Sequence, residues 1–123
     1  MFLKLGHTTL EVYPLAHQLV LHSYTVTSLF PIHERFGLST QIQRAATSIV
    51  LNIAEGSAHK SVVERCRYYE VARASLIELD AAFEIADNLS YFHSLEHPEL
   101  GDLIVTVFKK ITLLIKSNRE IQP

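Results

Sequence analysis

The feature that most constrains this chain is one long stripe of apolar side chains between residues 62 and 89. Its members recur every three or four residues, as side chains on one face of an α-helix do. No Gly or Pro interrupts the stretch, and at 1.5 Å per residue such a helix would reach roughly 40 Å. A helix this long in a chain of 123 residues needs partners of similar length beside it, which favours a helical bundle. The stripe comprises Val62, Cys66, Tyr69, Ala72, Leu76, Leu79, Phe83, Ala86 and Leu89.

Two shorter helices are predicted before this stripe from the same period and from residues that start or stop helices. The first covers residues 14–30, because Pro is tolerated in a first helical turn and Pro31 blocks continuation. The second begins near Thr40, which with Gln43 matches a capping box. We expect Gly56 to end this helix in a left-handed cap.

The ends of the remaining helices are marked in the same way. Ser61 and Glu64 form a capping box before the long helix, and Pro98 begins a fourth helix after a turn. Short connections between long helices predict an all-α, antiparallel, up-down-up-down four-helix bundle. The expected organisation is an N-terminal arm over residues 1–11, the bundle over residues 12–118 and a C-terminal tail over residues 119–123.

Composition limits the class of protein further. Hydrophobic residues make up 48% of the chain and charged residues 20%, which is typical of a soluble domain with a core. The single cysteine, Cys66, cannot form an intramolecular disulfide, and this indicates a reducing compartment. No secretion signal is evident, and no apolar run approaches the ~20 residues that span a bilayer. We therefore expect a cytoplasmic protein without membrane contact.

Helices one and two carry more apolar residues than the core of a bundle needs. Residues 19–21 and residues 49–51 are consecutive Leu, Ile or Val, and at 100° per residue three neighbours cannot all face one core. One interpretation is that the surplus surface meets another subunit, which favours a homo-oligomer. The other is a singly exposed leucine, which is common on protein surfaces.

Motifs for catalysis are missing from the sequence. No Glu is followed three residues later by His, as the di-iron sites of helical bundles require, and no Gly-rich phosphate loop exists. His93 and His97 have the spacing of zinc ligands but fall in the predicted turn, while His22 and Cys66 fall on apolar stripes. We therefore expect no enzyme activity, no catalytic residue, no cofactor and no bound metal.

Charge is distributed unevenly along a chain whose net charge is −2. Residues 35–73 hold six basic and three acidic side chains, whereas the remainder holds five basic and ten acidic ones. The basic excess either marks a docking face for an anion or an acidic partner, or pairs with charges on the other helices. Candidate nucleic-acid or partner contacts, combining positive charge with a stacking ring, are Lys60, Arg65, Arg67, Tyr68 and Arg73.

Polar residues also form a line on helix two. Arg44, Ser48, Asn52 and Glu55 are four, four and three residues apart, so they share one face, and Ser75 and Glu78 form a shorter line on helix three. These residues either make a polar seam that binds a partner or another subunit, or form a solvated face with an i, i+4 hydrogen bond or an interhelical ion pair between Arg44 and Glu78.

The segments 30–38, 41–46, 48–49 and 52–56 resemble the bacterial four helix bundle protein family, also called 23S rRNA intervening-sequence proteins. Ala72, Ser75 and Glu78 are similar to the family's motif in its third helix, and the likeness covers about residues 12–117. Val50 stands where the family usually has Pro, so helix two is expected to be straighter than in relatives. The matching motif or interface residues are Gln41, Arg44, Ser48, Asn52, Glu55, Gly56, Ser75 and Glu78.

The resemblance implies an antiparallel four-helix bundle that assembles as a homopentamer, with no assigned activity in most members. Some members are encoded inside insertions in ribosomal RNA genes. A relative, the accessory variability determinant of diversity-generating retroelements, binds a reverse transcriptase and nucleic acid. We therefore expect a non-enzymatic homo-oligomeric scaffold or adapter whose partners are its own copies. The alternative is an accessory protein that binds RNA or a reverse transcriptase.

Overall fold

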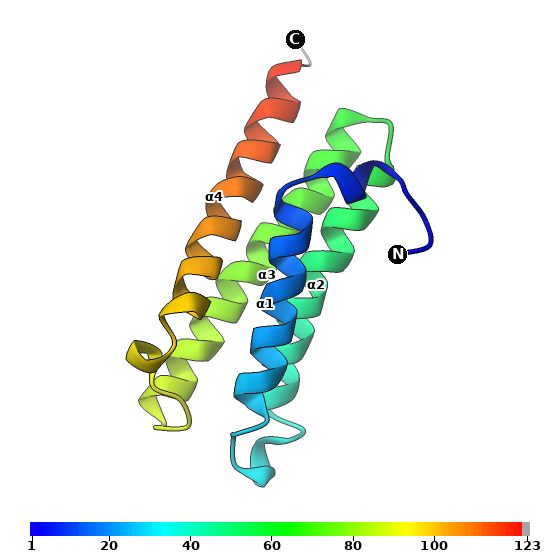
Figure 1. Ribbon diagram of the computed structural model, residues 1–123. Coiled ribbons are helices and arrows are strands. Elements are labelled where there is room, and N and C mark those ends of the chain that lie inside the picture. The colour runs from blue at the N-terminus through cyan, green and yellow to red at the C-terminus, as the bar shows by residue number, and fades with distance from the viewer. Residues whose placement is uncertain (122–123) are drawn as a thin grey trace.

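The computed structural model describes residues 1–121 and consists of four α-helices joined by short connections (Figure 1). Successive helices run in opposite directions, down, up, down and up, and no strand occurs among the described residues. The predicted all-α four-helix bundle is therefore confirmed. The helices are α1 (Val12–Thr27), α2 (Leu38–Ala58), α3 (Val62–Asn88) and α4 (Pro98–Ile121), with short 3-10 helices η1 (Gly6–Thr9), η2 (Ile32–Glu34) and η3 (Ser94–Glu96).

One apolar core runs along the bundle and receives side chains from all four helices. Leu19 of α1, Ile49 of α2, Leu79 of α3 and Ile111 of α4 are all completely shielded from solvent. Each such side chain stabilises the fold by roughly 1.5–3 kcal/mol through burial. The long stripe predicted for α3 faces this core, and only its end at Leu89 lies substantially exposed.

The two predicted capping boxes have different outcomes. Ser61 caps α3, because its Oγ accepts a hydrogen bond of 3.3 Å from the amide of Glu64, which is one of the two hydrogen bonds of the predicted box. The box at Thr40 is wrong. The helix α2 has already begun at Leu38, and the Thr40 hydroxyl donates to the carbonyl of Arg35 at 2.6 Å. The side chain of Glu34 instead accepts a hydrogen bond from the Leu38 amide at 3.4 Å, which satisfies one of the free donors at the helix start.

The prediction that Gly56 ends α2 in a left-handed cap is also wrong. Gly56 lies inside the helix and is buried, and no described glycine has a positive φ. A Cβ at this position would stand 2.9 Å from Cε1 of Tyr69 and 3.0 Å from Cβ of Tyr68. The missing side chain therefore allows α2 to approach α3 closely, and the glycine serves packing.

The two ends of the chain differ in how they meet the bundle. Residues 1–5 leave the bundle as an exposed arm, and η1 packs against α2. At the other end α4 continues through Ile121, so residues 119–121 of the expected tail are helical, while residues 122–123 lie outside the described residues. Within the described chain, no helix combines the length and the apolar character that crossing a membrane requires.

Candidate functional site

Three of the family-motif residues meet at the seam between α2 and α3. The hydroxyls of Ser48 and Ser75 lie 2.8 Å apart and share a hydrogen bond. The side-chain amide of Asn52 donates to the carbonyl of Ser48 at 2.8 Å and to its hydroxyl at 3.0 Å. Ser75 is buried and the other two are half-buried, so these contacts satisfy polar groups that close packing removes from water. The seam is thus built from small, mutually bonded side chains.

The other polar motif residues lie on the outer side of this seam and face solvent. Gln41, Arg44 and Glu78 are exposed, and Glu55 is an exposed partner of His59 at 3.9 Å. Within residues 1–121, no ion pair joins Arg44 to Glu78. These side chains are therefore available to a partner, although they do not converge on one another.

Two of the basic residues predicted to contact a partner are engaged inside the molecule instead. Nε of Arg65 donates to the side chain of Asn118 at 2.9 Å, and its Nη1 donates to the carbonyl of His59 at 2.9 Å. Arg73 donates to the hydroxyl of Thr112 at 3.3 Å. Both side chains therefore brace α3 against α4, and Arg65 also holds the turn between α2 and α3.

The remaining predicted contacts lie at the outer surface near that same turn. The side chain of Arg67 is 68% exposed and stands 3.5 Å from Glu64, and Lys60 is exposed. The ring of Tyr68 is half-buried and stacks on His59, with centroids 4.9 Å apart and planes 15° apart. The five predicted contacts therefore do not form one continuous surface, because Arg65 and Arg73 reach toward α4.

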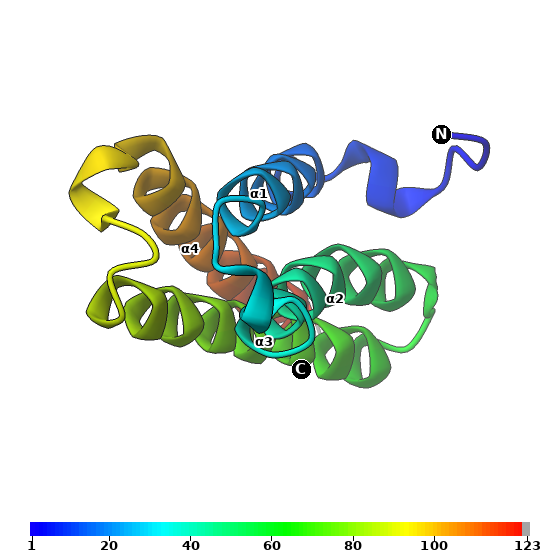
Figure 2. The same ribbon diagram turned by 90° about the horizontal axis from the view of Figure 1, so that it is seen from below.

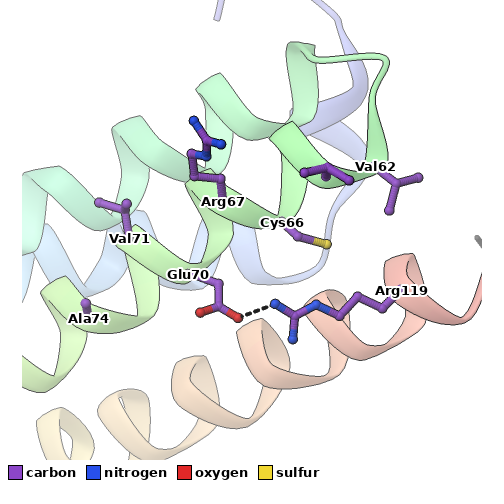
Figure 3. Close-up of a pocket in the computed structure, with 8 residues that line it drawn as sticks. Val62, Cys66, Arg67, Glu70, Val71, Ala74 and Arg119 are labelled. Atoms are coloured by element: carbon purple, nitrogen blue, oxygen red, sulfur yellow. Dashed lines mark hydrogen bonds and ion pairs between the residues drawn. The ribbon is translucent and has the colours of Figure 1, made fainter.

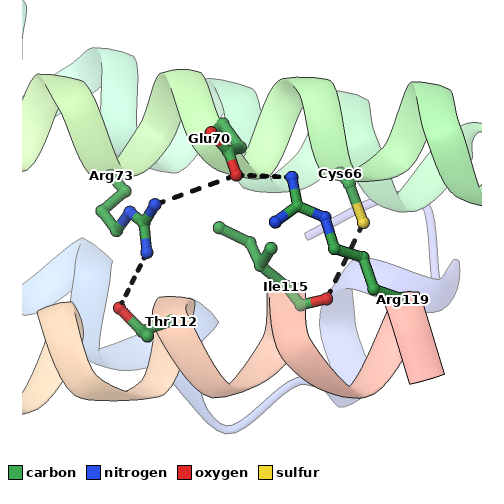
Figure 4. Close-up of polar contacts among 6 residues, drawn as sticks. All are labelled: Cys66, Glu70, Arg73, Thr112, Ile115 and Arg119. Carbon is green, nitrogen blue, oxygen red and sulfur yellow. Dashed lines mark hydrogen bonds and ion pairs between the residues drawn. The ribbon is translucent and has the colours of Figure 1, made fainter.

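An ionic cluster that sequence reasoning missed joins the N-terminal half of α3 to the C-terminal end of α4 (Figure 4). Arg119 contacts the carboxylate of Glu70 at 2.7 Å, and Arg73 stands 3.8 Å from the same oxygen. The Sγ of buried Cys66 lies 3.9 Å from the carbonyl of Ile115, as in a structural thiol. The sequence did contain one signal for the ionic cluster, namely Arg119 in the last turn of α4, where the helix dipole favours positive charge.

Grooves follow the line between α3 and α4. One of them has a volume of about 720 Å³ and is lined by apolar side chains of α3 together with Arg67, Glu70 and Arg119 (Figure 3). Farther along, Ile77, Val105 and Phe108 line a second groove of about 260 Å³. Such open, largely apolar walls are suited to receiving side chains of another protein.

The outer face of α3 is itself apolar, which sequence reasoning also missed. Ala74, Ile77, Ala81 and Ile85 are exposed and lie three or four residues apart, on the side of the helix away from the core. The helix is therefore apolar on two opposite faces. The surplus apolar residues predicted on α1 and α2 leave only Leu21 and Leu51 exposed on their helices, because Leu19 and Ile49 enter the core.

Comparison with known proteins agrees with this architecture. A crystal structure of a protein of unknown function from the S23 ribosomal protein family of Bacteroides thetaiotaomicron is similar, with a TM-score of 0.77 and 20% sequence identity. The likeness covers 85% of this chain and 98% of that one and shows the shared fold. No curated protein matches this chain.

A protein family model also matches most of this chain. The model of the 23S rRNA-intervening sequence protein family matches residues 8–113, which include α1, α2, α3 and most of α4. The matched segment also contains the seam between α2 and α3 with its bonded serines. The chain therefore belongs to the 23S rRNA-intervening sequence protein family.

Proposed function

We propose that this protein is a non-enzymatic, homo-oligomeric scaffold or adapter whose subunits associate through the outer face of α3. The observation that carries the proposal is the exposed apolar line formed by Ala74, Ile77, Ala81 and Ile85. One apolar face of a helix normally packs on the core, and a second, exposed apolar line is the kind of surface that marks an interaction site. Covering such surface contributes roughly 25 cal/mol for each Å² removed from water.

The shape of this face favours another helix as its partner. Ala74 and Ala81 are small, so a helix from a second copy can approach the α3 backbone between the larger Ile77 and Ile85. Helices pack when the ridges of one enter the grooves of the other, and small residues at the contact shorten the distance between axes. We propose a ring of five subunits as the assembly, since the family resemblance implies a homopentamer.

The test is the mass of the protein and of two variants by light scattering at tens of micromolar. Ala74→Glu with Ala81→Glu places two charges in the proposed contact, so this variant should be monomeric while keeping its helicity by circular dichroism. Phe36→Glu is the matched control, because Phe36 is 88% exposed and lies in the connection between α1 and α2. An assembly that survives the double substitution would contradict the proposed surface, and a monomeric wild-type protein would contradict the function.

A second candidate function is an accessory protein that binds RNA or a reverse transcriptase. The observation favouring it is the exposed Arg67 and Lys60 near the stacked rings of Tyr68 and His59. Binding of labelled structured RNA, followed by anisotropy, should weaken steeply with salt as phosphate counterions are released. The substitution Arg67→Glu should abolish RNA binding. Arg65→Glu is a poor probe, because Arg65 also makes hydrogen bonds that stabilise the fold. Binding that is unchanged in Arg67→Glu would exclude this surface.

A further inference from the structure

The arm at residues 1–5 presents apolar side chains that the bundle does not cover. Phe2 is 88% exposed and Leu3 is 65% exposed, and Lys4 follows them in the chain. A short segment with adjacent aromatic and aliphatic side chains gains free energy by burying them in an apolar groove. The arm therefore has the chemistry of a docking segment.

A groove of complementary chemistry lies between α3 and α4. Two cavities of about 260 and 230 Å³ adjoin there and share Asp80 and Ile104 as lining residues. The first is lined mainly by apolar side chains, including Ile77 and Phe108, together with Lys109. The second is lined by the carboxylates of Asp80, Glu84 and Asp87 among other residues. The groove thus offers an apolar end and an acidic end.

The arm and the groove lie at opposite edges of the same molecule. Figures 1 and 2 both show the arm beyond α2 and the line between α3 and α4 on the far side of the bundle. The arm is anchored at its base, because η1 packs against α2. Five extended residues reach about 17 Å, whereas crossing two helices takes at least ~20 Å. The arm therefore does not reach the groove of its own subunit.

We propose that the arm of one subunit lies in the groove between α3 and α4 of the next subunit. Phe2 and Leu3 occupy the apolar end near Ile77, and Lys4 faces the carboxylates of Asp80 and Glu84. The partner is a second copy of this chain, so the inference rests on the proposed homo-oligomeric function. Ile77 belongs both to the groove and to the outer face of α3, and the arm therefore extends the same subunit interface.

This contact has a direct consequence for the symmetry of the assembly. The arm and the groove are different surfaces, so each subunit uses one surface to hold its neighbour and the other to be held. Such head-to-tail contacts generate a closed ring when the rotation between subunits closes. The arm therefore makes every subunit of a ring contribute to the binding site of the next.

The proposal is tested by a disulfide between the two surfaces. In the double variant Phe2→Cys with Val105→Cys, mild oxidation should give a ladder of covalent species beyond the dimer on a non-reducing gel. Val105 is suitable because it lines the groove and is 52% exposed. Phe36→Cys with Val105→Cys is the matched control, since Phe36 is equally exposed but lies in the loop before α2, and it should give no ladder. The native Cys66 is buried and should stay reduced in all variants.

The outcomes separate this inference from the proposed function. A ladder only in the Phe2 variant supports the arm in the neighbouring groove. An oligomer by light scattering without a ladder overturns the arm contact and leaves the scaffold intact, and a product limited to dimers overturns the head-to-tail order. A monomeric wild-type protein overturns both. As a second measurement, Phe2→Ser with Leu3→Ser should raise the dissociation constant of the assembly at least tenfold, whereas Phe36→Ser should not change it.

Discussion

The two long edges of α3 are built in different ways. Toward α2, Gly56 leaves no side chain in front of the Tyr69 ring and the hydroxyls of Ser48 and Ser75 meet at 2.8 Å, so the helices share their most extensive contact. Toward α4, long side chains such as Arg119 bridge to α3, and the grooves open between them. Small residues bring helix axes together, whereas long charged residues hold them apart and leave surface for partners.

This difference divides the molecule into a closed seam that carries stability and a grooved seam that carries interaction surface. The closed seam depends on shape, so a single added carbon atom should be felt strongly. The grooved seam shares the apolar core and adds exposed ion pairs outside it, and such pairs contribute little to the free energy of unfolding. Substitutions in the two seams should therefore differ in size and in their response to salt.

The largest effect is expected at Gly56. Gly56→Ala places a Cβ within 3.0 Å of Tyr69 and Tyr68, and the resulting overpacking should cost about 1–3 kcal/mol. The gain in helix propensity, roughly 0.5–1 kcal/mol, offsets part of this cost. The matched control is Gly101→Ala in α4, where nothing stands within 4 Å of the added carbon, and it should stabilise by roughly 0.5–1 kcal/mol. Urea unfolding curves measure both changes. If both substitutions shifted the urea midpoint equally and in the same direction, close packing at Gly56 would have no effect on stability, which would contradict the prediction.

A smaller effect is expected at the pair of serines. Ser48→Ala and Ser75→Ala should each cost roughly 0.5–1.5 kcal/mol by removing the shared hydrogen bond. The double substitution should cost less than the sum of the two, because the second change removes a hydroxyl that has already lost its partner. A double-mutant cycle in urea measures the coupling. Strict additivity would show that the contact contributes nothing.

The ionic cluster of the grooved seam should matter less still. Arg119→Ala removes the contact with Glu70, whose side chain is 39% exposed, so the loss should stay below about 1 kcal/mol and vanish at high salt. In Arg119→Ala, amide hydrogens in the last turns of α4 should exchange faster than in the wild-type protein. The exchange rates in α2 should not change. If Arg119→Ala lowered the free energy of unfolding as much as Gly56→Ala does, the grooved seam would contribute as much to stability as the closed seam, contrary to this prediction.

The smallest effect concerns an exposed ion pair between the chain before α1 and α4. The hydrogen bond and charge of Lys110, at 2.8 Å, hold the pKa of Glu11 below its usual value of 4.5. A lowered pKa in the folded state stabilises the protein at pH values above 4.5, and this contribution is lost as the pH falls through the lowered pKa. The urea midpoint of the wild-type protein should therefore slightly exceed that of Glu11→Gln at pH 6, and the difference should shrink as the pH is lowered to 3. A difference that is just as large at pH 3 would contradict this ion pair.

Local signals in the sequence predicted the number and course of the helices. The spacing of apolar residues in α3, the Ser61 cap and the start of α4 at Pro98 each depend on a few neighbouring residues, and all three are confirmed. The consecutive apolar residues 19–21 and 49–51 predicted apolar surface outside the core, and Leu21 and Leu51 are indeed exposed.

Features that depend on contacts distant in sequence were missed. Gly56 looked like a helix end because its neighbour in space, Tyr69, lies on another helix. The direction of Arg65 is set by Asn118, and Arg119 finds Glu70 across 49 residues. Thr40 failed as a cap because the turn at Glu34 starts the helix earlier. Spacing along one helix carries no information about these partners.

The most direct test of the account is the mass of the wild-type protein by sedimentation equilibrium, measured over a dilution series from tens of micromolar. If the outer face of α3 is covered by another copy, the mass should be a fixed multiple of 13.9 kDa, five-fold for the proposed ring. A mass of 13.9 kDa at every concentration would contradict the account, because the apolar face of α3 would then remain in contact with water.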